Sequence, residues 1–409
     1  MSKDLTDTGK GKAGIGYPAI CLGLYYILTP LDLTAVSGLG SLLRLFALIP
    51  SAAILLNLDR CTLGLKESLL LILYALYKLL SITYTVFPVF TMNEVPRIIS
   101  NFGLVFILGS LYRFKQEELE FLKKSLFIAS IITIFFIIIF ADFSAGGRLT
   151  IRTSVNEVDH NYLTGYLLFL VPVSVRNFLV RRRYLSLLPI LTAYIIFIMT
   201  GSRGGLLAII LVTLLSGWGA LAGRRDTRSL IRIVIFLLAG ALGLIIAIGF
   251  LDPEVLERFS PDYMEENGTS GRKDIWIYLF KVFLHASPMR QLFGHGAGTT
   301  AFVNRMNTRM GGHVAHNVWV DELTTGGLIG LFLLILLHFA FLIIALKCRD
   351  VFTASVYAGF LIMCMNLSIV AFKPMLNVMI LIMLIHKNQQ LELRKGRIPD
   401  DHIIQTKAT

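Results

Sequence analysis

Three polar blocks interrupt an otherwise apolar chain and contain arginine, histidine, carboxylate and amide side chains. The first block includes Arg148, Asp159 and Asn161. The second is the run Thr200-Gly201-Ser202-Arg203-Gly204-Gly205, and the third contains Arg258, Arg272, His313, His316 and Asn317. Arginine presents several planar donors that match the geometry of phosphate oxygens. The three blocks therefore predict an anionic substrate, a phosphate or a diphosphate.

Arg203 is the hardest of these charges to explain by membrane topology alone. It stands where two apolar stretches, 184–201 and 203–222, meet. A charge buried at such a junction costs a few kcal/mol unless it is paired or lines a wet cavity. We therefore expect an anionic partner for Arg203, whereas any one of the other arginines could be a solvated side chain in a long loop.

His313 and His316 are three residues apart and could share one face of a helix. A zinc site would need a third ligand, and no residue supplies one at a familiar spacing. The sequence therefore predicts no metal site and favours an acid–base or hydrogen-bonding histidine. A histidine that only bonds to backbone groups at the membrane interface is the alternative.

The composition places these blocks in a membrane protein. Hydrophobic residues make up 55% of the 409 residues, charged residues make up 16%, and the mean hydropathy is +0.72. A soluble domain carries about 25% charged residues. The net charge of +12 is scattered in short clusters between apolar runs, which argues against a nucleic-acid partner. We expect an all-α polytopic bundle, with 1–409 as a single integral membrane domain.

Twelve apolar stretches approach the length of about 20 residues that a membrane crossing needs. They lie at 15–33, 38–57, 66–88, 94–112, 122–142, 160–180, 184–201, 203–222, 229–251, 318–346, 351–372 and 374–386. Basic residues lie in or beside every connection that this count places inside, namely 58–65, 113–121, 181–183, 223–228 and 347–350. By the positive-inside rule, both termini are predicted to be cytoplasmic.

The segment 252–316 is too long for a simple connector and is predicted to be an extracytoplasmic loop. Ser270 can cap a helix that runs from Gly271 to about His285. Further on, Gly294, Gly296 and Gly298 allow a tight irregular turn. The loop is therefore expected to be partly helical and to carry much of the active site.

In their order and spacing, the polar blocks resemble those of the O-antigen ligase/polymerase family of polytopic glycosyltransferases. The resemblance covers roughly 145–335. It rests on Asp159-His160-Asn161, Thr200-Gly201-Ser202-Arg203-Gly204, Gly271-Arg272 followed by Trp276, Phe293-Gly294-His295-Gly296, and the His316-Asn317 block that runs to Gly330. Many family members have Asp-Pro-Asn where this chain has Asp159-His160-Asn161, so the role of His160 is open.

The resemblance implies transfer of a glycan from undecaprenyl diphosphate to an acceptor hydroxyl on the outer face of the bacterial inner membrane. The transfer would proceed with inversion and would need no metal or other cofactor. By motif, Arg203 and Arg272 match the arginines that hold the diphosphate, and His316 matches the essential histidine near the acceptor. Further substrate contacts are expected from Arg148, Arg258, His313, Asn317, Asp159 and Asn161. The expected partners are the lipid-linked donor, a glycan or lipid acceptor, membrane lipid and other polysaccharide-assembly proteins.

Two branches of this family and one other class of protein fit the sequence. Polymerases lengthen the glycan on its lipid carrier, and ligases move it onto lipid A–core. The stretches around Gly146-Gly147-Arg148 and from Asp159 to Gly165 favour a surface-polysaccharide polymerase. A flippase or secondary transporter is the alternative from another class, although the halves show no convincing repeat and the polar residues gather at the outer interface.

Overall fold

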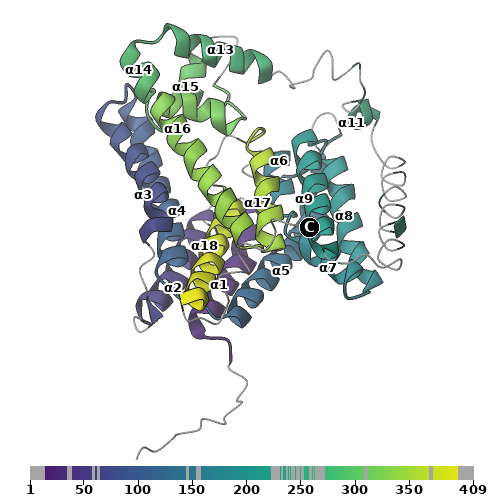
Figure 1. Ribbon diagram of the computed structural model, residues 1–409. Helices are drawn as coiled ribbons and strands as arrows, with labels where there is room; N and C mark the ends of the chain where they lie inside the picture. The colour runs from purple at the N-terminus through teal and green to yellow at the C-terminus, as the bar shows by residue number, and fades with distance from the viewer. Residues whose placement is uncertain are drawn as a thin grey trace, which may run out of the picture.

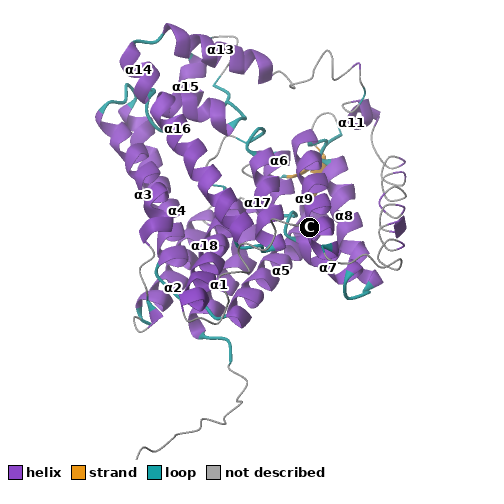
Figure 2. Ribbon diagram, in the orientation of Figure 1, coloured by secondary structure: helices purple, strands orange, loops and turns teal. Residues whose placement is uncertain are grey.

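The computed structural model is a bundle of α-helices with one two-stranded sheet (Figures 1 and 2). It describes residues 14–34, 39–57, 60–61, 65–143, 147–152, 158–222, 253–257, 272–307, 312–367 and 372–394, together with isolated residues between 231 and 262. The ninth predicted span, 229–251, lies largely outside the described residues.

The helices of the first half of the chain are connected by short 3₁₀ turns and loops. They are α1 (Tyr17–Leu28), α2 (Leu39–Leu55), α3 (Leu65–Leu80), α4 (Pro88–Ser110), α5 (Gln116–Phe140), α6 (His160–Gly165), α7 (Leu170–Leu179), α8 (Leu187–Met199) and α9 (Arg203–Leu221). The predicted span 160–180 is thus two helices, α6 and α7, with a turn between them.

The described residues of the second half form short helices first and then three that belong to the bundle. The short ones are α11 (Pro253–Glu257), α13 (Arg272–His285), α14 (Pro288–Phe293) and α15 (Thr300–Arg305). The others are α16 (Val318–Lys347), α17 (Val351–Met363) and α18 (Lys373–Arg394). Figure 1 shows α13, α14 and α15 gathered around the beginning of α16, at one end of the bundle. The helix predicted to end at about His285 is confirmed as α13.

One hairpin departs from the all-α prediction. Strands β1 (Ala141–Phe143) and β2 (Leu149–Ile151) pair antiparallel, with Asp142 opposite Thr150. Three residues per strand are too few to produce a recognisable alternation of polar and apolar residues. The hairpin follows α5 and lies close to α6 (Figure 2).

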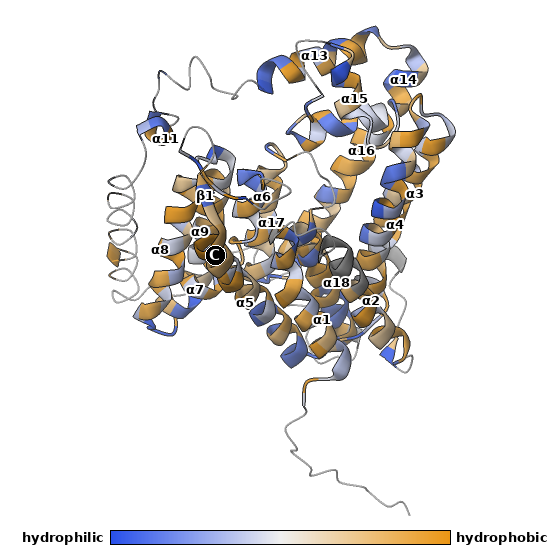
Figure 3. Ribbon diagram, turned by 180° about the vertical axis from the view of Figure 1, so that it is seen from behind, coloured by the Kyte–Doolittle hydropathy of each residue, from blue (hydrophilic) through white to orange (hydrophobic). Residues whose placement is uncertain are grey.

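The helices have the apolar character of a membrane protein (Figure 3). Four of them are long and apolar enough to cross a membrane: Gln116–Phe140, His160–Leu179 (α6 and α7 together), Arg203–Leu221 and Val318–Lys347. Five shorter apolar helices accompany them within the described residues. Large apolar side chains such as Ile138, Leu188 and Phe332 are exposed on the outside, as expected where lipid is the solvent. Twelve crossings and the inward orientation of both termini remain predictions.

The last helix, α18, lies inside the bundle and contacts α4, α5, α16 and α17. Its residues Val378, Ile380 and Ile382 have no exposed surface, although Ile380 lies on the opposite side of the helix from the other two. A helix that is apolar all round is buried in the core or in lipid. The weakest predicted span, 374–386, is therefore a central helix of the bundle.

The predicted glycine turn packs against a kink in α16. Gly327 interrupts the helix with φ 62°, and Gly294, Gly296 and Gly298 all have positive φ, as the turn requires. A Cβ on Gly294 would lie 2.4 Å from the backbone of Thr325, so only glycine allows this approach. The kink and the turn thereby fix the short helices that precede α16 against its beginning.

Candidate functional site

Side-chain hydrogen bonds join the first polar block to the second. Oδ1 of Asp159 accepts hydrogen bonds from the backbone N–H and the side-chain amide of Asn161, at 2.8 and 2.9 Å, and so caps α6. The Ser202 hydroxyl donates to Oδ1 of Asn161 at 2.6 Å and accepts from the Gly205 N–H at 3.1 Å. Ser202 is thereby the N-cap of α9. These bonds hold the first residue of α9, Arg203, beside the beginning of α6.

Arg272 reaches the same end of α9 from α13. It is the first residue of α13, and its Nη1 donates to Oδ1 of Asn366 at 3.1 Å. Asn366 lies just after α17 and packs against α9, because a Cβ on Gly204 would lie only 1.9 Å from its Nδ2. The elements that carry Arg203 and Arg272 therefore meet at one side chain, that of Asn366.

His316 is half-buried and faces Asp159, with 3.9 Å between its Nδ1 and Oδ2 of the carboxylate. Its backbone has φ 49°, in the left-handed region that favours glycine. Such a conformation costs about 1–3 kcal/mol in a residue with a side chain and persists where the surroundings impose it. The predicted shared helix face of His313 and His316 is therefore wrong, since both residues precede α16 in an irregular segment.

Hydrogen bonds from three other parts of the fold fix the conformation of the irregular segment around His316. Nε1 of Trp276 in α13 donates to the Ala315 carbonyl at 2.7 Å. The Val318 N–H donates to the Cys364 carbonyl at 2.9 Å, and the Asn304 amide donates to the His313 carbonyl. The segment that carries His316 is thus tied to α13, to α15 and to the end of α17.

The surroundings keep His316 in its neutral form. Burial lowers its pKa below the ordinary value, and the positive charges of Arg272 and, more weakly, His313 act in the same direction. The Asp159 carboxylate opposes them but does not reverse the shift. A neutral imidazole beside a carboxylate and an arginine can accept a proton from a hydroxyl group.

Asn317, expected at the substrate, is occupied in capping α16. Its Oδ1 accepts from the backbone N–H groups of Trp319 and Val320, at 3.0 and 3.3 Å, and the residue is buried. The role that the structure gives this side chain is to start α16 directly after His316. An asparagine directly before a long apolar run is a known signal for the start of a helix, and the sequence contains it at Asn317.

The remaining expected substrate residues divide by location. Arg148 lies beside the second polar block, where its Nε donates to the Thr200 carbonyl at 2.8 Å. His313 is exposed and lies three residues before His316 in the chain. Arg258 lies outside the described residues. Within the part of the chain that the structure describes, no three histidine, cysteine or carboxylate side chains form a group that could hold a metal ion.

Two features of this region were not anticipated from the sequence. One is Asn366, which nothing in its surrounding sequence marks. The other is a buried ion pair between α3 and α16, in which Lys78 Nζ lies 2.9 Å from Oε2 of Glu322 and also donates to Thr325 at 3.0 Å. The Tyr74 hydroxyl donates to the same carboxylate at 2.7 Å. A lone lysine in an apolar helix, such as Lys78, predicts an anionic partner, but the sequence does not identify that partner as Glu322.

Three comparisons with known proteins bear on this site. The model of a family described as "O-Antigen ligase" matches residues 188–335, which include Arg203, Arg272 and His316. No curated protein matches the chain significantly. A solved structure described as "Structural coordination of polymerization and crosslinking by a peptidoglycan synthase complex" aligns with 14% sequence identity, covering 80% of this chain and 98% of that chain. Its TM-score of 0.46 is too low to support a shared fold.

Proposed function

Residues 188–335 match the O-antigen ligase family, and from that match we propose that this membrane protein is an inverting glycosyltransferase. Its donor is a glycan linked to undecaprenyl diphosphate, and its acceptor is a sugar hydroxyl on the outer face of the inner membrane. The family match supports an enzyme of the ligase or polymerase type. The donor, the acceptor and the stereochemistry are parts of the proposal.

The observation that carries the proposal is that His316 faces the Asp159 carboxylate at 3.9 Å and feels the positive charge of Arg272. In the proposed step, the acceptor oxygen attacks the anomeric carbon of the donor sugar while the bond from that carbon to the diphosphate oxygen breaks. The diphosphate leaves with the bonding electrons. Nδ1 or Nε2 of His316 takes the hydroxyl proton, and attack opposite to the leaving group inverts the anomeric centre.

Arg272 and Arg203 are assigned to the leaving diphosphate. Negative charge grows on the diphosphate as the bond breaks, and fixed positive charge near it lowers the barrier. The contact between Arg272 and Asn366 supports this role, because it presents the guanidinium at the end of α9 where Arg203 begins the helix. The beginning of a helix, where Arg203 lies, also favours an anion.

We assign the enzyme to the polymerase branch, with an O-antigen, capsule or exopolysaccharide as product. The sequence around Gly147-Arg148 and Asp159 supports this branch, and the hairpin places Arg148 against the second polar block. A ligase that acts on lipid A–core is the second candidate. Partners of a polymerase would include other polysaccharide-assembly proteins.

Purified protein with a synthetic lipid-diphosphate glycan tests the proposal in detergent, where transport is undefined. A polymerase converts the glycan to longer lipid-linked products, whereas a ligase transfers it only when lipid A–core is added. Absence of any transfer, under conditions in which the protein is folded and binds the lipid-linked donor, would favour the flippase or transporter alternative.

A further inference from the structure

A polar cavity lies at the other end of α9 and α17, away from His316. The two helices pack antiparallel, so that α17 begins at the cavity and ends near Asn366. The 19 residues of α9 span about 28 Å at about 1.5 Å per residue, which separates this cavity from Arg203. The cavity has a volume of about 460 Å³ and is formed by α5, α7, α9 and α17.

Basic side chains dominate the polar part of this cavity. Its lining contains five of them and two carboxylates: Lys123, Lys124, Arg176, Arg181, Arg349, Glu120 and Asp350. Both carboxylates pair with the same buried lysine, Lys123, which bonds to Glu120 at 2.8 Å and also to Asp350. Within the described part of the chain, neither carboxylate pairs with Lys124, Arg176 or Arg181. The cavity therefore keeps an excess of positive charge.

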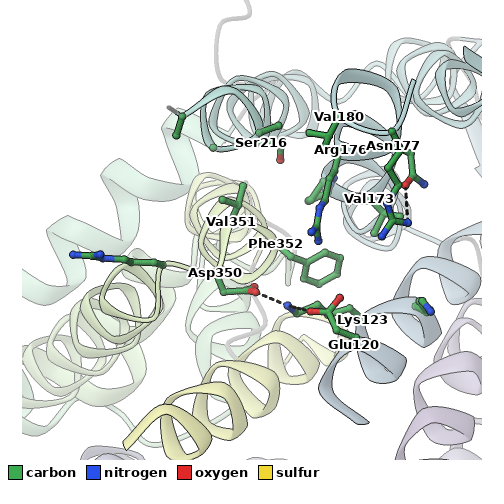
Figure 4. A pocket seen from close by; sticks show the side chains of 17 residues that line it. Glu120, Lys123, Val173, Arg176, Asn177, Val180, Ser216, Asp350, Val351 and Phe352 are labelled. Carbon is green, nitrogen blue, oxygen red and sulfur yellow. Dashed lines mark hydrogen bonds and ion pairs between the residues drawn. The ribbon is translucent and has the colours of Figure 1, made fainter. Parts of the chain in front are cut away.

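The side chains converge on the cavity from separate helices. Figure 4 shows Arg176 of α7 directed toward Phe352 of α17 and toward the pair of Lys123 and Asp350. The Arg181 guanidinium is held by the Asn177 side chain, at 3.3 Å. An anion in this space would meet arginines whose carboxylate neighbours are already bound to Lys123.

Another part of the lining is apolar. Pro172, Val173, Val180 and Val351 contribute to it. Next to the lining residue Gly219, the Trp218 side chain is 81% exposed. Exposed tryptophan is typical of the interface between the hydrocarbon and the lipid headgroups. The cavity thus presents positive charge at headgroup depth and an apolar wall beside it.

We propose that this cavity binds the phosphate-bearing headgroup of an anionic lipid, with the lipid tails against its apolar wall. The positive-inside rule explains why basic residues occur on this face, which is predicted to be cytoplasmic. It does not require that two carboxylates be sequestered by one buried lysine, or that the remaining charges line a cavity. The arginines bind the headgroup phosphate through charge-assisted hydrogen bonds, as is usual for lipid sites of basic character.

The test uses the full chain in nanodiscs of phosphatidylcholine that contain a minor fraction of phosphatidylglycerol. Native mass spectrometry counts the phosphatidylglycerol molecules that stay bound after release from the disc. The variant Arg176→Gln/Arg181→Gln removes two cavity charges and is expected to weaken phosphatidylglycerol binding by about tenfold or more. The matched control is Arg182→Gln/Arg183→Gln, which removes two charges next to Arg181 that do not line the cavity. This variant should bind phosphatidylglycerol like the wild type.

Equal retention of phosphatidylglycerol by the wild type and the cavity variant would overturn the proposal, as would an equal loss in the control. A further arm adds inorganic pyrophosphate to lipid-free protein in detergent. Tight binding of pyrophosphate that depends on Arg176 and Arg181 would show a soluble ligand instead of a lipid. If Arg176→Gln/Arg181→Gln does not fold, Lys124→Gln/Arg181→Gln replaces it, because both of these side chains are exposed.

Discussion

The guanidinium of Arg272 donates a hydrogen bond to the side-chain oxygen of Asn366, at 3.1 Å, across 94 positions of sequence. The amide nitrogen of the same asparagine lies against Gly204, in the first turn of α9. One side chain therefore sets both the direction of Arg272 and the approach of α17 to the helix that Arg203 begins. The proposed diphosphate site depends on this link.

Gly204→Ala tests the link without touching an arginine. The new Cβ would overlap the Asn366 amide, which must turn away and release Arg272. We expect a folded protein whose transfer activity falls about tenfold or more, the effect of a misplaced charged donor worth about 1.5–3 kcal/mol. The measurement is glycan transfer by purified protein at saturating acceptor.

The matched control is Gly217→Ala, in the same helix. Among the described residues, no heavy atom outside the helix lies within 4 Å of a Cβ at this position, so the substitution should leave activity unchanged and stabilise α9 slightly. Equal activity of the two variants would mean that Asn366 does not position the anion site.

Arg272→Lys keeps the positive charge but loses the planar fork. A lysine at this position cannot bond to Asn366 and to two diphosphate oxygens with the same geometry. We expect transfer to fall by about ten- to a hundredfold, with a smaller change in donor affinity, since the loss is greatest where charge develops in the transition state. Steady-state kinetics against donor concentration separates the two effects, and an unchanged rate would remove Arg272 from the proposed site.

The sequence predicted the local elements of the site better than their assembly. A glycine turn at 294–298 and a helix that ends at His285 both follow from local residue preferences, and both are present. Asn366 could not be identified, because its importance comes from a contact with Arg272 in another part of the fold. The irregular backbone at His316 was likewise missed, since hydrogen bonds from α13, α15 and the end of α17 impose it, and these are not encoded in the spacing of two histidines.

The buried pair of Lys78 and Glu322 should be essential for stability. The two side chains are 10% and 1% exposed, so Lys78→Met would leave a carboxylate without its cation in the core. We expect this single variant to lose about 3–5 kcal/mol of unfolding free energy. Lys78→Met/Glu322→Gln removes both charges, keeps an acceptor for the Tyr74 hydroxyl, and should recover most of that loss. Arg113→Met breaks the more exposed pair with Glu392 and should cost no more than about 1 kcal/mol.

Thermal unfolding in detergent compares these three variants with the wild type. A double variant as unstable as Lys78→Met would show that the pair itself, and not the uncompensated charge, stabilises the contact between α3 and α16. A small effect of Lys78→Met would indicate that water reaches Glu322.

The pH dependence of transfer tests the role of His316 as a base. A base must be neutral to accept a proton, and burial together with Arg272 lowers the pKa of His316 below its ordinary value. The rate should therefore be constant near pH 7 and fall as the pH drops through the lowered pKa. Asp159→Asn removes the one neighbour that raises this pKa, so the acid limb should move to still lower pH. Asparagine is also a good N-cap, so α6 should remain intact.

His316→Gln should lose the acid limb together with about two or more orders of magnitude in transfer, the usual contribution of a general base. Glutamine keeps a donor and an acceptor but cannot change its protonation near neutral pH, so a purely structural histidine would be replaced with little loss. His313→Gln serves as the control and should be milder, because His313 is exposed and contributes only a weak charge effect at His316. The profile of kcat/KM against pH, measured with equal donor binding, separates the two roles. Near-normal turnover of His316→Gln with an unchanged acid limb would assign that limb to another group and leave the arginines as the whole of the catalytic apparatus.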